Sequence, residues 1–177
     1  ILVAVPLGAA LTRLKRGSET VIKVVGVFQT IPSLALLSIM IPFFGIGKIP
    51  AVIALFLYSL LPILRNTYVG IRSVDATYLD AAKGMGMSQM QRLLQIELPL
   101  AMGVIMAGIR VSTVYVISWT TLAAYIGAGG LGDYIFNGLN LYRMDLVLMG
   151  TIPITLLALL SDALLKHSEQ KLTMDRG

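Results

Sequence analysis

The stretch "DAAKGMGMSQMQRLLQIELP", Asp80 to Pro99, is a polar, helix-forming segment set among segments that are mostly apolar. Just before it, Asp75 is a suitable N-cap for a short helix over 76–83, because its carboxylate can accept from free N–H groups of the first turn. Gly84 and Gly86 predict the end of that helix, since glycine takes the left-handed C-cap conformation without a steric penalty.

A second short helix is predicted over 89–98, "QMQRLLQIEL". Ser88 followed by Gln91 is a capping-box pattern, which marks a helix start. Pro99 cannot donate to a helix ladder, so it predicts a bend or a fresh start where the next apolar segment begins. The predicted order is helix, glycine corner, helix, apolar segment. Local chemistry alone leaves open an amphipathic loop at a membrane surface.

The composition around this stretch predicts an all-α membrane protein with a single domain over 1–177. Of the 177 residues, 56% are hydrophobic and only 13% are charged, about half the charged share of a soluble domain, and cysteine is absent. Too little polar chain remains to cover the apolar segments as buried helices of a soluble protein. We expect about five spans, the first one partial: Ile1–Leu11, Val24–Phe44, Ile49–Leu64 with an extension towards Gly70, Leu98–Ile126 and Leu146–Leu165.

The basic residues predict the orientation of these spans. When the spans alternate in direction, nearly all Lys and Arg fall on one side, which is the cytoplasmic side by the positive-inside rule. This distribution accounts for the sequence pI of about 9.6 without nucleic acid. Only Lys48 and Arg143 fall on the other side. The cytoplasmic group is Arg13, Lys15, Arg16, Lys23, Arg65, Arg72, Lys83, Arg92, Lys166, Lys171 and Arg176.

Polar residues and prolines interrupt the spans, and backbone groups freed in lipid need partners inside the protein. These breaks favour a bundle that lines a path, although each could equally be a packed kink. Several aromatic residues could offer cation–π surfaces, although aromatic residues near a membrane interface more often serve packing: Tyr58, Tyr68, Tyr115, Trp119 and Tyr125. Arg110 lies within a span, which is costly unless it is close to the cytoplasmic interface or has a partner such as Glu97, Asp162 or a carbonyl. The candidate path residues are Gln29, Thr30, Ser33, Tyr58 and Asn66.

The stretch from Asp80 to Pro99 resembles the "EAA" signature of permease subunits of ABC importers. The matching pattern is Asp80-Ala81-Ala82, three residues, Gly86, nine residues, then Ile96-x-Leu98-Pro99; Asp80 stands where Glu is usual. The resemblance implies that residues of about 75–98 form a cytoplasmic coupling module, docked in a groove of an ATPase subunit. The residues implied in coupling are Asp80, Ala81, Ala82, Gly86, Ile96, Leu98 and Pro99.

Further segments, among them "FQTIPSLALL" and "LAAYIGAGGLGDYI", look like the subfamily that imports osmoprotectants such as glycine betaine, carnitine and choline. Relatives of this type are also associated with ergothioneine. The resemblance implies two cytoplasmic ATPase subunits that carry ATP and Mg²⁺, a second permease subunit, and an extracytoplasmic substrate-binding protein or fused binding domain. It places the chain in the plasma membrane of a bacterium. The alternative from another class is an ion-coupled secondary transporter or a channel.

Two glycine-rich motifs do not predict nucleotide binding on this chain. "GAGGLG", Gly127–Gly132, follows a membrane span instead of a strand and lacks the acidic residue that a dinucleotide site needs. "GIGK", Gly45–Lys48, lacks the first glycine and the Ser or Thr of a P-loop. His167 is the only histidine and has no ligand cluster in the sequence. We therefore expect no catalytic residues, cofactor or metal on this chain.

Overall fold

The computed structural model describes residues 1–14 and 17–174, and all the regular elements in this part of the chain are helices, which confirms the all-α class. Lys15, Arg16 and Arg176, which the sequence assigned to the cytoplasmic group, lie outside the described residues. The helices are α1 (Ala4–Arg13), α2 (Ser18–Phe28), α3 (Ser33–Phe44), α4 (Lys48–Arg72), α5 (Ala76–Gly84), α6 (Gln89–Arg92), the π-helical turn η1 (Leu93–Glu97), α7 (Leu98–Ala124), α8 (Leu131–Asn140) and α9 (Met144–Met174).

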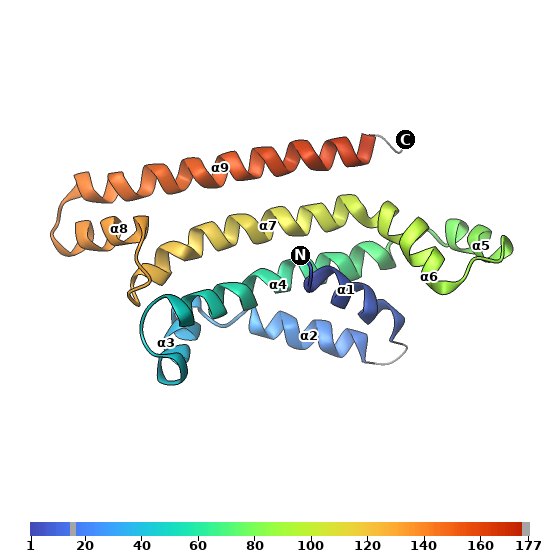
Figure 1. Cartoon of the computed structure of the whole chain (residues 1–177), viewed down its shortest axis with the longest axis horizontal. Helices are drawn as coiled ribbons and strands as arrows, with labels where there is room; N and C mark the ends of the chain where they lie inside the picture. The colour runs from blue at the N-terminus through green and yellow to red at the C-terminus, as the bar shows by residue number, and fades with distance from the viewer. Residues whose placement is uncertain (15–16, 175–177) are drawn as a thin grey trace.

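The long helices α4, α7 and α9 lie side by side along the long axis of the molecule (Figure 1). Three described helices are long and apolar enough to cross a membrane: Lys48–Arg72, Gln89–Ala124 and Met144–Gln170. Figure 1 shows α5 and α6 at one end of these helices, and α8 and α3 at the other. Each of the last three predicted spans therefore corresponds to one long helix.

Residues 24–44, expected as one span, form two helices instead. α2 ends at Phe28 and α3 begins at Ser33, so the break falls on the polar residues and the proline between them. Pro32 disfavours helical geometry at the residue before it, which explains the position of the break. The Tyr58 hydroxyl of α4 donates to the carbonyl oxygen of Ile31, so one freed backbone group finds its partner inside the protein.

α4 is the central helix of the packed core, with α1 on one side and α7 on another. Thr67, on α4, is fully buried, and a Cβ added at Gly8 of α1 would come within 2.8 Å of its Cβ. On the α7 side, a Cβ at Gly108 would lie 2.6 Å from the Cβ of Asn66. The absence of side chains at these glycines lets the helix backbones approach closely.

The sequence did not predict a helix over Leu131–Asn140, yet α8 occupies this segment and packs on α9 and α7. Its glycines face other helices at short range. A Cβ at Gly132 would lie 2.6 Å from the carbonyl oxygen of Thr121, and one at Gly138 would lie 2.7 Å from the backbone nitrogen of Val147. Glycine is a poor helix former in isolation, so tertiary packing holds this helix together.

Candidate functional site

The first helix of the predicted coupling module begins as the sequence indicates. The backbone N–H of Thr77 donates to the Asp75 carboxylate at 2.7 Å, which makes Asp75 the N-cap of α5. This hydrogen bond holds the pKa of Asp75 below its ordinary value, because it favours the charged carboxylate. Further along α5, Lys83 donates to Asp80 at 2.7 Å, and both side chains are exposed.

The corner of the module turns at Gly86 and not at Gly84. Gly84 is the last residue of α5, whereas Gly86 has a φ of +75°. The N–H of Met87 donates to the carbonyl of Ala82, and the N–H of Gly86 donates to that of Lys83. These two bonds form a Schellman motif with Gly86 at the left-handed C′ position, where glycine avoids the Cβ penalty.

The second helix of the module starts with the predicted capping box. The Ser88 hydroxyl accepts from the Gln91 N–H at 3.3 Å, and the Gln91 side-chain oxygen accepts from the Ser88 N–H at 2.8 Å. Of the helix predicted over 89–98, the first four residues form the α-helix α6. The next five, Leu93–Glu97, form the wider π-helical turn η1.

The predicted start of a helix at Pro99 is confirmed, because α7 begins at Leu98 with Pro99 in its first turn; the helical backbone nevertheless continues through η1, from Gln89 to Ala124. A proline inside an α-helix has no N–H to donate and collides with the carbonyl four residues earlier, here that of Gln95. The wider π-helical turn directly before Pro99 changes the local hydrogen bonding and so accommodates the ring. The module is therefore continuous with the long helix α7.

Glu97, within the signature, is buried with 4% of its surface exposed and accepts from the Arg13 guanidinium at 2.7 Å. Arg13 is the last residue of α1, so this ion pair joins the end of the first helix to the base of the module.

Glu97 was one expected partner of Arg110. The structure pairs Arg110 with Asp162, as also expected, and with Glu169, which was not among the expected partners.

The predicted coupling residues divide into an exposed and an inner group. Asp80, Ala81 and Gly86 are exposed, Ala82 is fully buried, and Ile96, Leu98 and Pro99 are half-buried. The exposed group shares the module surface with large apolar side chains that are also exposed: Tyr78, Met85, Met90 and Leu94. This mixture of apolar and charged groups, at the end of the molecule seen in Figure 1, is suited to contact another protein.

The predicted path residues do not form one cluster. Ser33 and Tyr58 line a small cavity together with Trp119, and the Tyr58 and Trp119 rings meet edge to face with centroids 3.9 Å apart. Gln29 and Thr30 lie at the break between α2 and α3.

Asn66 lies apart from this cavity. It donates to the carbonyl of Pro62 at 2.8 Å and packs beside Gly108, at the α4–α7 contact.

Tyr115 and Trp119, which were named as possible cation–π surfaces but not as path residues, lie close to Tyr58. Their four-residue spacing puts them on one face of α7, where their rings stack at 5.6 Å with 14° between the planes. Among residues 1–14 and 17–174, no group of three or more His, Asp or Glu side chains is placed to hold a metal ion.

The chain matches the family model of the binding-protein-dependent transport system inner membrane component over residues 3–174. The carnitine transport permease protein OpuCB of Listeria monocytogenes is 58% identical to the chain over 98% of its length and 79% of the relative. The glycine betaine/carnitine/choline transport system permease protein OpuCB of Bacillus subtilis is 54% identical, over 98% of this chain and 80% of the relative.

Among solved structures, a chain of the MetNI methionine ABC transporter in an inward-facing conformation superimposes with a TM-score of 0.87. The match covers 97% of this chain and 86% of the other, at 22% sequence identity, and so concerns the fold.

Proposed function

The chain belongs to the family of binding-protein-dependent transport system inner membrane components, and on this premise we propose what it carries and how it is driven. It is the membrane-spanning permease subunit of an ATP-driven importer of quaternary ammonium osmoprotectants such as glycine betaine, carnitine or choline. The chain itself carries out no covalent chemistry. ATP and Mg²⁺ are bound by two cytoplasmic ATPase subunits, and cargo arrives on an extracytoplasmic binding protein or fused binding domain.

The observation that carries the proposal is the helix, Gly86 corner and helix at one end of the bundle, with charged and apolar groups exposed on its surface. α6 and η1 continue directly into α7, so a force on the module acts on a membrane-spanning helix without an intervening loop. Two such chains, identical or sister permeases, form the path. Closure of the ATPase pair draws the two modules together and reorients the spans.

The distribution of charge supports a cytoplasmic location of the module in a bacterial plasma membrane. Arg72, Lys83 and Arg92 lie at or near the module, while Lys48 and Arg143 lie in or beside the turns at the opposite end. The positive-inside rule assigns the richer end to the cytoplasm.

The test is uptake by the complete importer, with its ATPase and binding subunits, in sealed vesicles. We expect ATP-dependent uptake of labelled glycine betaine that unlabelled carnitine, choline or ergothioneine reduces by competition. Unlabelled sugar, peptide or inorganic anion should have no effect. Competition only by one of these three controls would refute the substrate class.

A matched preparation with an inactivated ATPase separates the two classes of transporter. We expect its uptake to fall to background at any imposed ion gradient. Uphill uptake that persists and follows a sodium or proton gradient would instead identify an ion-coupled secondary transporter.

A further inference from the structure

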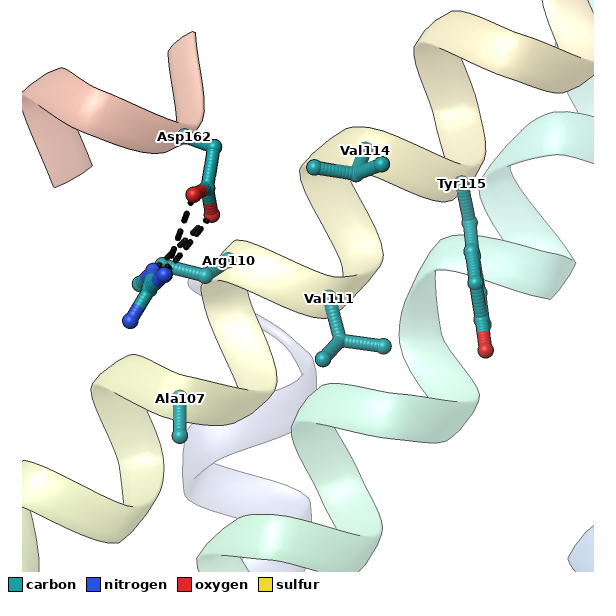
Figure 2. A pocket seen from close by; sticks show the side chains of 6 residues that line it. All are labelled: Ala107, Arg110, Val111, Val114, Tyr115 and Asp162. Carbon is teal, nitrogen blue, oxygen red and sulfur yellow. Dashed lines mark hydrogen bonds and ion pairs between the residues drawn. The ribbon is translucent and has the colours of Figure 1, made fainter. Parts of the chain in front are cut away.

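A groove of about 310 Å³ runs along α7, lined by Ala107, Arg110, Val111, Val114, Tyr115 and Asp162. Figure 2 shows the Arg110–Asp162 pair at one edge, Tyr115 at the other, and the two valines between them. The volume is at the lower end of the range found for small-molecule sites, and the pattern of an apolar floor with a few polar groups is typical of them.

The charged edge lies towards the end of α9 that carries Glu169, four residues beyond the predicted span Leu146–Leu165. Arg110 is twelve residues after the start of α7 and fourteen before its end, or about 18 and 21 Å along the axis. It binds Asp162 through Nε and Nη2, at 3.0 and 3.1 Å, and Glu169 through Nη1 at 2.9 Å. The side chains of Arg110 and Asp162 are 24% and 39% exposed.

Charged groups within a span are costly against hydrocarbon, and these three side chains are paired with one another. The groove thus has one edge at which charges are paired. Its opposite edge is aromatic: Tyr115 is 45% exposed and stacks on Trp119, which in turn packs against Tyr58. This stack fixes the Tyr115 ring as a rigid π surface.

We propose that this groove is a cargo subsite within the transport path, which rests on the function proposed above. The Tyr115 ring takes the trimethylammonium group through a cation–π contact. Arg110 already binds two carboxylates, those of Asp162 and Glu169, so this cluster favours the cationic end that glycine betaine, carnitine and choline share.

The chain has no cysteine, so a single introduced thiol reports directly on the groove. Val111→Cys places it on the groove floor. Leu164→Cys is the matched control, because Leu164 is exposed on α9 only two residues from Asp162 but about 200° around the helix. The probe is a water-soluble methanethiosulfonate reagent that carries a trimethylammonium group, applied to the complete importer in vesicles. Modification is measured as the mass increase of this chain.

We expect Val111→Cys to be modified, Leu164→Cys to remain unmodified, and saturating glycine betaine to slow the modification of Val111→Cys at least tenfold. Modification that cargo does not slow would overturn the subsite. Absence of modification would overturn it as well, and a disulfide between two copies through Val111→Cys would assign the groove to a subunit interface.

Uptake in the same vesicles separates this result from the proposed function. Protection by glycine betaine without its uptake would leave the subsite standing and refute the transport proposal. Uptake of glycine betaine without protection of Val111→Cys would refute the subsite and leave the transport proposal standing.

A second pair of variants tests the aromatic edge. Tyr115→Phe keeps the ring and Tyr115→Leu removes it. In the Val111→Cys background, we expect the glycine betaine concentration for half-protection to rise five- to tenfold with Tyr115→Leu and to stay within twofold with Tyr115→Phe. Equal effects of the two substitutions would overturn the role of the ring, because both remove the hydroxyl and only Tyr115→Leu removes the ring.

Discussion

At the scale of single residues, the module owes its corner to one glycine. Gly86 sits at φ +75° with open space where a Cβ would be, so backbone conformation and not crowding restricts this position. Gly84, two residues earlier, also has open space around it but is helical. The two glycines thus differ mainly in backbone conformation.

We predict that Gly86→Val leaves the permease inserted and abundant but reduces ATPase co-purification and coupled uptake about tenfold. A non-glycine residue in the left-handed region costs about 1–2 kcal/mol, which can shift the docking surface without unfolding the bundle. Gly84→Ala is the control and should be neutral or slightly stabilising. Abundance, ATPase co-purification and uptake are measured together. Normal uptake at normal abundance would contradict the coupling role, and lost abundance would show a folding role.

The Arg13–Glu97 pair predicts an asymmetry between its two partners. Arg13→Ala leaves the buried Glu97 carboxylate without its counter-ion, at a cost of about 3 kcal/mol, since an uncompensated buried charge is strongly destabilising. Glu97→Gln removes the buried charge while the more exposed Arg13 can turn to water, at a cost of about 1 kcal/mol. Thermal unfolding of the purified importer in detergent measures both. Equal losses would show that the ion pair is not the main contribution of either residue.

At the scale of elements, glycine contacts set the distance between α4 and α7. We predict that Gly108→Ala destabilises the protein by about 1–3 kcal/mol, because its Cβ would lie 2.6 Å from that of Asn66 and the helices would have to separate. Gly26→Ala, in α2, is the matched control: nothing lies within 4 Å of the added Cβ. It should be neutral or stabilising by up to about 1 kcal/mol. The melting temperatures of the two variants in one detergent decide the comparison.

The sequence predicted the helix ends of the coupling module correctly where capping residues determine them. Asp75, Ser88 with Gln91, and the glycine corner are all found as predicted, because the groups that satisfy a helix end lie within a few residues of it. The helical continuity between α6 and α7 was missed, since the π-helical turn that provides it has no simple sequence pattern.

Features that depend on distant parts of the chain could not be predicted in the same way. α8 was missed because its stability comes from glycine contacts with α7 and α9. The partner of Glu97 is 84 residues away, and those of Arg110 are 52 and 59 residues away. Sequence spacing reveals neighbours within a helix but not pairs between helices. The predicted coupling and path residues remain predictions.

At the scale of the whole molecule, the helices place the module at one end and the α8–α9 turn at the other (Figure 1). We predict that Gln89→Cys is labelled only from the cytoplasm and Asn140→Cys only from outside. The cysteine-free chain serves as its own background. Membrane-impermeant maleimide on intact cells and on inverted vesicles makes the measurement. The reverse pattern would invert the orientation and remove the module from the reach of any cytoplasmic ATPase.

The π-helical turn between the module and α7 has a consequence for which changes the protein tolerates. Each residue added to or removed from a continuous helix rotates everything beyond it by roughly 100°. The direction in which the module faces is therefore encoded in the number of residues between Arg92 and Leu98, more than in their identities. Substitutions within 93–97 change the stability of the π-helical turn but not the direction of the module. One insertion or deletion there would rotate the docking surface away from its partner, although every contact residue would still be present.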